Sequence, residues 1–193
     1  AYGQRIIPNV IVNSCVKIAA MGYAVPGSVI AVGILIPLGA FDNAVDEWMY
    51  NNFNISTGLL LSGTIIALIY AYLVRYLAVS FQTISSSLTK IQPNLDDASR
   101  SLGYGAFATL WKVHLPLMTG GILTALMLVF VDVMKELPAT LVMRPFNFDT
   151  LAVRVYQYAS DERLIEASAP ALAIILVGVL PVIALSYRIA KSR

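Results

Sequence analysis

Three ionisable side chains lie close together near the end of a long apolar stretch. Asp132, Lys135 and Glu136 are spaced i, i+3 and i+4, so a helix places them on one face. If that stretch crosses a membrane, such groups are costly there and indicate a functional site, here a pathway or gate. A structural pair of Lys135 with Asp132 or Glu136 explains them equally well. Asp132 lies 16 residues beyond Pro116, about 24 Å along a helix, which predicts a position near the outer interface.

Proline and glycine mark further candidate pathway positions. Pro26 and Gly27 open one apolar stretch, and Pro138 follows Glu136 at the end of another. A helix break inside a membrane is tolerated where neighbouring helices or a cavity satisfy the backbone. Small residues around Gly27 also suit close helix packing. Both interpretations, a pathway-lining break and plain packing, stay open.

Enzymatic and metal chemistry find little support in the remaining residues. His114 is the single histidine and Cys15 the single cysteine, and no His, Cys or carboxylate cluster has metal-ligand spacing. There is no Gly-x-x-x-x-Gly-Lys-Ser/Thr sequence for binding ATP phosphates. We therefore predict a non-catalytic chain that binds no cofactor or metal of its own.

The elements that carry these residues are predicted from the spacing of the charges. Hydrophobic residues form 58% and charged residues 12% of the 193-residue chain, whereas a soluble domain has about a quarter charged residues. Stretches of 24, 27, 19 and 21 uncharged residues follow Lys17, Glu47, Lys112 and Glu166 respectively. A spanning helix needs roughly 20 apolar residues. We expect an all-α polytopic membrane protein with helices near 22–41, 57–78, 117–138 and 168–189.

The basic residues are divided unequally between the two sides of this arrangement. One side holds nine Lys and Arg, and the other holds four. Basic residues favour the cytoplasmic side, so residues 1–20, 79–116 and the C-terminus are predicted to be cytoplasmic, and residues 42–56 and 139–167 to face outward. The nine are Arg5, Lys17, Arg75, Lys90, Arg100, Lys112, Arg188, Lys191 and Arg193.

The long cytoplasmic segment 79–116 contains a predicted helix outside the membrane. Its first part, SFQTISSSLTK, is turn-like, and Pro93 with Asn94 and Asp97 then has the form of a helix start with a capping box. Leu95, Ala98 and Leu102 follow as an apolar stripe, before Gly103 and Gly105 interrupt the helix. Such a helix fits a groove of a partner protein or the lipid headgroup layer.

These residues resemble the EAA loop of ABC importer permeases. The matching positions are DAS at 97–99, Gly103 and VHLP at 113–116, with the spacing of Glu-Ala-Ala, three residues, Gly, nine residues, Ile-x-Leu-Pro. In that family the loop is a coupling helix that docks in a cleft of the cytoplasmic ATPase. The resemblance implies ATPase contacts at Asp97, Ala98, Ser99 and Gly103, with Leu115 and Pro116 fixing the return into the membrane.

Two further stretches are similar to iron(III)-type permeases. They are GYAVPG at residues 22–27 and VDVMKELPATL at residues 131–141, the latter followed by RPF and FDTLA. The resemblance implies a single transmembrane permease domain over residues 1–193 of a bacterial inner membrane, truncated at its N-terminus. It also implies a second permease half, an ATPase dimer holding ATP and Mg²⁺, and a periplasmic or lipoprotein substrate-binding protein.

Other functions stay open from the sequence. Permeases for thiamine, polyamines or anions share the EAA loop, so iron(III) rests on family likeness. A membrane anchor that recruits a cytoplasmic partner without transporting anything also fits the hydropathy and the loop. Nothing in the sequence indicates a nucleic-acid partner, whereas the lipid membrane is a direct expectation from the composition.

Overall fold

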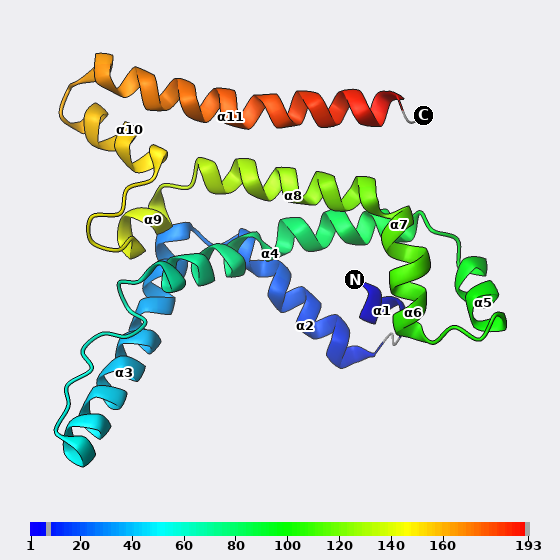
Figure 1. The fold of residues 1–193 in the computed structure, drawn as a ribbon, viewed down its shortest axis with the longest axis horizontal. Coiled ribbons are helices and arrows are strands. Elements are labelled where there is room, and N and C mark those ends of the chain that lie inside the picture. The colour runs from blue at the N-terminus through cyan, green and yellow to red at the C-terminus, as the bar shows by residue number, and fades with distance from the viewer. Residues whose placement is uncertain (7–8, 192–193) are drawn as a thin grey trace. The chain divides into compact units, whose positions relative to one another are not determined.

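The computed structural model describes residues 1–6 and 9–191, which fold into helices without any strand (Figure 1). The all-α prediction is confirmed. The elements in chain order are α1 (Tyr2–Ile6), α2 (Val10–Ala20), η1 (Met21–Tyr23), α3 (Gly27–Phe53), α4 (Ile65–Thr89), α5 (Asn94–Ser101), α6 (Ala106–Thr109), the π-helical η2 (Leu110–His114), α7 (Leu115–Leu117), α8 (Thr119–Met134), α9 (Pro138–Met143), α10 (Leu151–Ser160) and α11 (Leu164–Lys191).

Three of these helices are long and apolar enough to cross a membrane. They are α3, α4 and residues Leu164–Ile183 of α11. A fourth candidate is the pair Ala106–Leu117 and Thr119–Met134, which passes the same test together but bends by 75°. Spanning needs about 20 apolar residues. The prediction of a polytopic membrane protein with about four spans is therefore confirmed for the described part of the chain.

The predicted span boundaries were wrong in two places. Helix α3 continues through the acidic residues after position 41 and ends at Phe53. Helix α4 begins only at Ile65 and runs to Thr89. Residues 80–89, predicted as a turn-like part of a cytoplasmic loop, are therefore helical. Charge spacing failed here because it assumes that every charge lies outside a helix that spans.

Two aspartates explain how α3 continues past its predicted end. Asp42 is fully buried and accepts hydrogen bonds from the backbone N–H groups of Leu61 (3.0 Å) and Ser62 (2.7 Å). Asp46, one turn later, accepts from the N–H groups of Thr57 (2.6 Å) and Gly58 (2.8 Å). Both carboxylates thus satisfy loop amides that would otherwise lack partners. These contacts fold the α3–α4 connection back onto α3.

The described residues form two compact units, and α4, α8 and α11 each contribute to both. Unit 2 comprises Gly22–Tyr76 and Asp132–Gly178. Its core is built from α3, α4 and α9, and four buried alanines allow close approach of these helices. The buried members are Ile30, Ala31, Ile34, Ala67, Leu68, Ala71, Ala139 and Met143.

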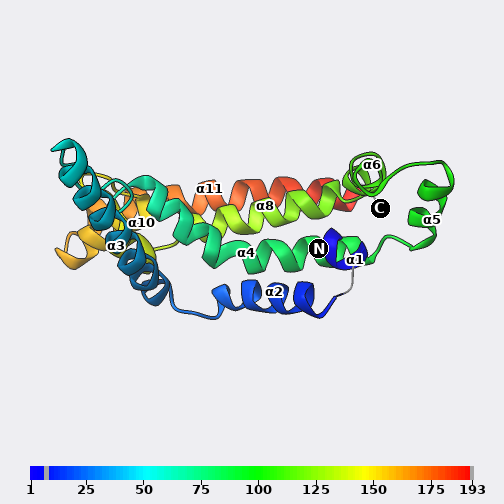
Figure 2. The same cartoon turned by 90° about the horizontal axis from the view of Figure 1, so that it is seen from below.

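Unit 1 comprises Ala1–Met21, Leu77–Val131 and the described residues of Val179–Arg193. Its buried core is small: Leu88, Ile91 and Met118, with Ala1 and Tyr2 packed against them. Figure 2 shows α1 beside the C-terminal end of α4, within this unit. Arg193, one of the nine basic residues of the orientation argument, lies outside the described residues.

Candidate functional site

An ion pair lies inside the second candidate span, in unit 2. Arg75 is the eleventh residue of α4, about 15 Å from its first residue. Its Nε lies 3.2 Å from Oε2 of Glu136, a side chain that is only 5% exposed. The Tyr76 hydroxyl donates to the same Oε2 at 2.7 Å. The backbone N–H of Ala139 donates to Oε1 at 3.0 Å. A buried charge needs such a partner and these hydrogen bonds to be stable.

Gly27 completes this cluster because it has no side chain. It is the first residue of α3, after Pro26 at the N-cap position, and it is buried. A Cβ atom there would overlap Nη1 of Arg75 and lie 2.6 Å from Oε1 of Glu136. A glycine is therefore required for α3 to approach the ion pair this closely.

The structure brings most of the predicted pathway residues together. Gly27 and Glu136 are in the cluster, and the carbonyl oxygen of Asp132 lies 3.1 Å from the Tyr76 hydroxyl. Lys135 is 64% exposed and pairs with Asp132 at 2.8 Å, one of the two pairings that the sequence allowed. The hydrogen bond to Asp132 raises the pKa of Lys135. Pro138 is exposed and begins α9 at its first turn.

Arg75 was not predicted as a site residue from the sequence, and its predicted position was wrong. We counted it among the cytoplasmic charges at the end of a predicted helix, whereas it lies well inside α4. Glu136 pairs with Arg75 and not with Lys135. The available signal was Arg75 itself, a single charge within the stretch 48–89 that was otherwise free of Asp, Glu, Lys and Arg.

The helix predicted within residues 79–116 is present in unit 1 as α5. The predicted capping box is absent, because Pro93 occupies the N-cap position and no side chain caps the helix. Its end is as predicted: Gly103 has a left-handed φ of +79°. The N–H groups of Gly103 and Tyr104 donate to the carbonyl oxygens of Arg100 (2.9 Å) and Ser99 (3.1 Å). This is the Schellman pattern of a glycine-terminated helix.

The inner face of α5 is polar and fixed to the rest of unit 1. Asp96 pairs with Arg5 at 2.7 Å and with Nε2 of His114 at 2.6 Å. The Ser99 and Thr109 hydroxyls are 2.7 Å apart, and Ser99 is 3% exposed. Burial alone would raise the pKa of Asp96, but the hydrogen bonds from Arg5 and His114 outweigh it and hold that pKa below its ordinary value.

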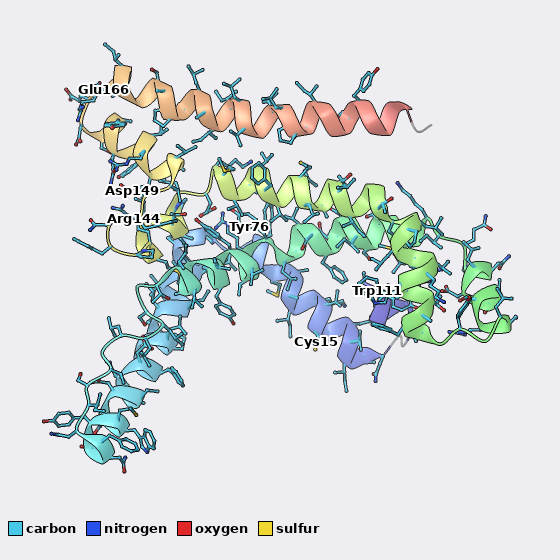
Figure 3. All side chains as sticks on the ribbon, in the orientation of Figure 1. Cys15, Tyr76, Trp111, Arg144, Asp149 and Glu166 are labelled. Atoms are coloured by element: carbon cyan, nitrogen blue, oxygen red, sulfur yellow. The ribbon has the colours of Figure 1, made fainter. Side chains whose placement is uncertain are left out.

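The outer face of α5 and the segment after it are apolar and exposed. Leu95, Ala98 and Leu102 lie on this outer face, and Leu102 is 76% exposed. Phe107 and Trp111, on α6 and η2, are also exposed, and Figure 3 labels Trp111. We call Leu95, Ala98 and Leu102 the apolar docking face. Patches of this kind on a protein mark sites that bind another surface.

The residues predicted to contact an ATPase occupy different environments. Asp97, Ala98, Gly103 and Pro116 are exposed, Leu115 is half-buried, and Ser99 is buried against Thr109. His114, to which the sequence assigns no site role, is fully buried at the end of the π-helical η2. Among the described residues, no three His, Cys, Asp or Glu side chains converge as metal ligands.

Comparison with known proteins assigns the family. Residues 9–192 match the family described as "Binding-protein-dependent transport system inner membrane component". The chain belongs to this family. It is also 30% identical over 160 residues to the Fe(3+)-transport system permease protein FbpB 2 of Haemophilus influenzae, an alignment that covers 83% of this chain and 28% of that protein.

Two other relatives of this inner membrane component differ in their named substrates. The ferric transport system permease protein FbpB of Actinobacillus pleuropneumoniae is 24% identical over 76% of this chain and 21% of its own length. The putative 2-aminoethylphosphonate transport system permease protein PhnV of Salmonella typhimurium is 28% identical over 69% of this chain and 50% of its own length. The chain spans about a quarter of the ferric permeases and about half of PhnV.

The segment 139–167 of this family member folds into α9, α10 and their connections. Arg144 and Arg154 both pair with Asp149, the latter at 3.1 Å (Figure 3). Phe146 is 95% exposed beside this cluster. The mixed charges found in the sequence are therefore partly neutralised among themselves. The segment is an ordered surface of unit 2 rather than a long loop.

Proposed function

We propose that this chain is part of the transmembrane permease of an ATP-driven importer, and that α5 is the helix through which a partner ATPase acts on it. The family description names a transport system that depends on a binding protein. The candidate spans supply the membrane part, and α5 supplies an element outside it. ATP and Mg²⁺ belong to the partner ATPase dimer, and a second permease half completes the pathway.

The observation that carries the proposal is the orientation of α5. Its polar residues Asp96 and Ser99 are used internally, so the apolar docking face is turned outward. Helices that lie on anionic lipid have Lys and Arg on their polar face, whereas the first turn of α5 carries Asp96 and Asp97. The arrangement therefore favours a groove in a partner protein over the lipid headgroup layer.

The proposed topology places residues 79–116 and the C-terminus in the bacterial cytoplasm and residues 139–167 outside, facing the substrate-binding protein. With Arg75 assigned to the interior of α4, eight basic residues still lie on the proposed cytoplasmic side against four on the other. A cysteine at Lys90 or at Asp161, in a Cys15→Ser background, tests this. We expect a membrane-impermeant maleimide to label position 161 in intact cells and position 90 only after permeabilisation. The reverse pattern would overturn the topology.

Iron(III) is the substrate that we propose, because three of the related permeases carry ferric or Fe(3+) transport in their names. A phosphonate is the second candidate, because PhnV matches over half of its length. The complete permease with its ATPase and binding protein, reconstituted in proteoliposomes, separates these candidates. We expect ATP-dependent uptake of iron-55 that excess 2-aminoethylphosphonate does not reduce. Uptake of the phosphonate alone would replace the first candidate by the second.

Leu102→Arg in the same complex tests the docking role of α5, with Leu102→Met as the matched control. The arginine places a charge on the apolar docking face, so we expect loss of ATPase co-purification and of uptake. The methionine keeps the face apolar and should leave both near the wild-type level. Normal docking and uptake with Leu102→Arg would refute the role of α5. ATP hydrolysis without uptake of any tested solute in the wild-type complex would favour a membrane anchor.

A further inference from the structure

Helix α1 contacts the elements that precede and follow α5 in the chain, namely the end of α4 on one side and α6 with η2 on the other. The Tyr2 hydroxyl donates to the carbonyl oxygen of Ala106 at 2.9 Å, at the start of α6. The Tyr2 ring lies 5.0 Å from the ring of His114. Tyr2 also packs against the small core formed by Leu88, Ile91 and Met118. Helix α1 thus contacts the end of α4, α6 and η2.

Arg5 connects the end of α4 to α5. Its Nη1 donates to the carbonyl oxygen of Leu88 at 2.7 Å and its Nη2 to that of Ile91 at 3.0 Å. The last carbonyl groups of a helix lack partners within the helix, so a cation there is stabilising. The Nε and Nη2 atoms of the same guanidinium lie 2.8 and 2.7 Å from Oδ2 of Asp96. One planar side chain therefore holds two segments at a fixed distance.

Asp96 makes a second connection through its other oxygen. Its Oδ1 lies 2.6 Å from Nε2 of His114. Because an ionised carboxylate only accepts hydrogen bonds, Nε2 carries the proton and donates it. His114 ends η2, directly before the 75° bend that leads into α8. Asp96 is thus linked to α4 on one side and to the entry of α8 on the other.

The covalent connections of α5 are compliant by comparison. It is joined to α4 by residues 90–93 and to α6 by residues 102–105, which include Gly103 and Gly105. Within the described part of the chain, its side-chain hydrogen bonds to other segments come from Asp96 and Ser99. Movement of α5 alone would be absorbed by such connections. The contacts of Asp96 add direct links from α5 to the end of α4, through Arg5, and to the entry of α8, through His114.

We propose that Arg5, Asp96 and His114 are positioning residues that transmit the movement of α5 to α4 and α8, and that α1 is thereby part of the coupling apparatus. This inference rests on the proposed function of α5. These three side chains lie away from the apolar docking face, so they act on transmission and not on docking. The proposal predicts that docking and coupling can be separated by substitution.

The test uses the complete permease complex in proteoliposomes with three readouts: ATPase co-purification, ATP hydrolysis and iron-55 uptake. A hydrogen bond to a charged group is worth roughly tenfold in an equilibrium. For Arg5→Met we expect co-purification within about twofold of wild type and about a tenfold fall in uptake per ATP hydrolysed. The double variant Arg5→Met/Asp96→Asn should transport less per ATP than Arg5→Met alone, because Asp96→Asn also weakens the link to His114, but the loss should be smaller than the sum of the two single effects because both remove the Arg5–Asp96 connection.

Lys17→Met on α2 also removes a basic residue, here an exposed one, and is the control that should transport normally. Arg5→Lys keeps the charge without the planar fork, so its uptake per ATP should be intermediate; it decides the matter if Arg5→Met does not assemble. Unchanged uptake per ATP in Arg5→Lys and Arg5→Met would overturn the proposal. So would a loss of co-purification that parallels the loss of uptake. No ATP-dependent uptake by the wild-type complex would instead refute the proposed function.

Discussion

Replacing Gly27 by alanine tests whether the start of α3 must lie against the Arg75–Glu136 pair. The added Cβ would overlap Nη1 of Arg75 and lie 2.6 Å from Oε1 of Glu136. Ordinary contact begins near 3.4 Å, so the carboxylate must retreat by about 0.8 Å, and the guanidinium by more, if the pair is to survive. Such overpacking costs about 1–3 kcal/mol, and separating the buried pair costs about 3–5 kcal/mol.

Gly33→Ala is the matched control within the same helix. A Cβ at Gly33 meets no atom within 4 Å, so only helix propensity changes. Alanine there should stabilise α3 by about 0.5–1 kcal/mol. The two variants should therefore differ by at least about 1.5 kcal/mol in the free energy of unfolding, with Gly27→Ala the less stable.

The assay is thermal unfolding of the full permease in mixed micelles, followed by the loss of helical circular dichroism. We expect a lower Tm for Gly27→Ala than for wild type and an unchanged or higher Tm for Gly33→Ala. Adding Glu136→Gln to Gly27→Ala should cost less than Glu136→Gln alone, because the pair is already disturbed. If Gly27→Ala and Gly33→Ala had the same Tm, the close approach described for α3 would be wrong.

Three further predictions concern other parts of the fold. Asp42→Asn should lower the Tm by several degrees, because Asp42 accepts buried amide hydrogen bonds. Glu47→Gln, at an exposed position of the same helix, should leave the Tm unchanged. Equal effects of the two variants would contradict the role of Asp42 in holding the α3–α4 connection against α3. Gly103→Ala places a side chain at φ +79° and should cost about 1 kcal/mol and reduce uptake, whereas Gly105→Ala, at φ −72°, should transport normally. The pKa of Asp96 lies below its ordinary 3.8, so its contribution to stability is present above about pH 4 and is lost as the pH falls through the lowered pKa. The difference in hydrogen-exchange protection of α5 between wild type and Asp96→Asn should then be the same at pH 7 and at pH 5. A difference that disappears at pH 5 would contradict the pairing of Asp96 with Arg5 and His114.

The sequence was sufficient for the fold class, the approximate number of spans and the short helix α5. Long uncharged stretches predict spans because a lone charge is expensive in lipid. The α5 stripe and its glycine end were visible because helix periodicity and a left-handed termination are local properties. The spacing also showed that Lys135 and Asp132 share a face, and they do form a pair.

The misplaced boundaries have a common physical cause. Arg75 is compatible with the interior of α4 because Glu136, 61 positions later, supplies its counter-charge. Asp42 is compatible with α3 because the amides of Leu61 and Ser62 satisfy it. Neither partner is identifiable from local spacing. The same holds for Arg5, whose partner Asp96 lies 91 residues away.

The bend at Met118 places the helical arm Ala106–Leu117 nearly perpendicular to α8. The arm Ala106–Leu117 has 12 residues, which is about 18 Å of helix. A tilt of about 10° of this arm moves its far end by about 3 Å, roughly half of one helical turn. Because the next arm leaves at 75°, a tilt in the plane of the bend is directed almost entirely along the axis of α8. A small rotation of the arm Ala106–Leu117 about its Ala106 end then displaces α8 along its own axis.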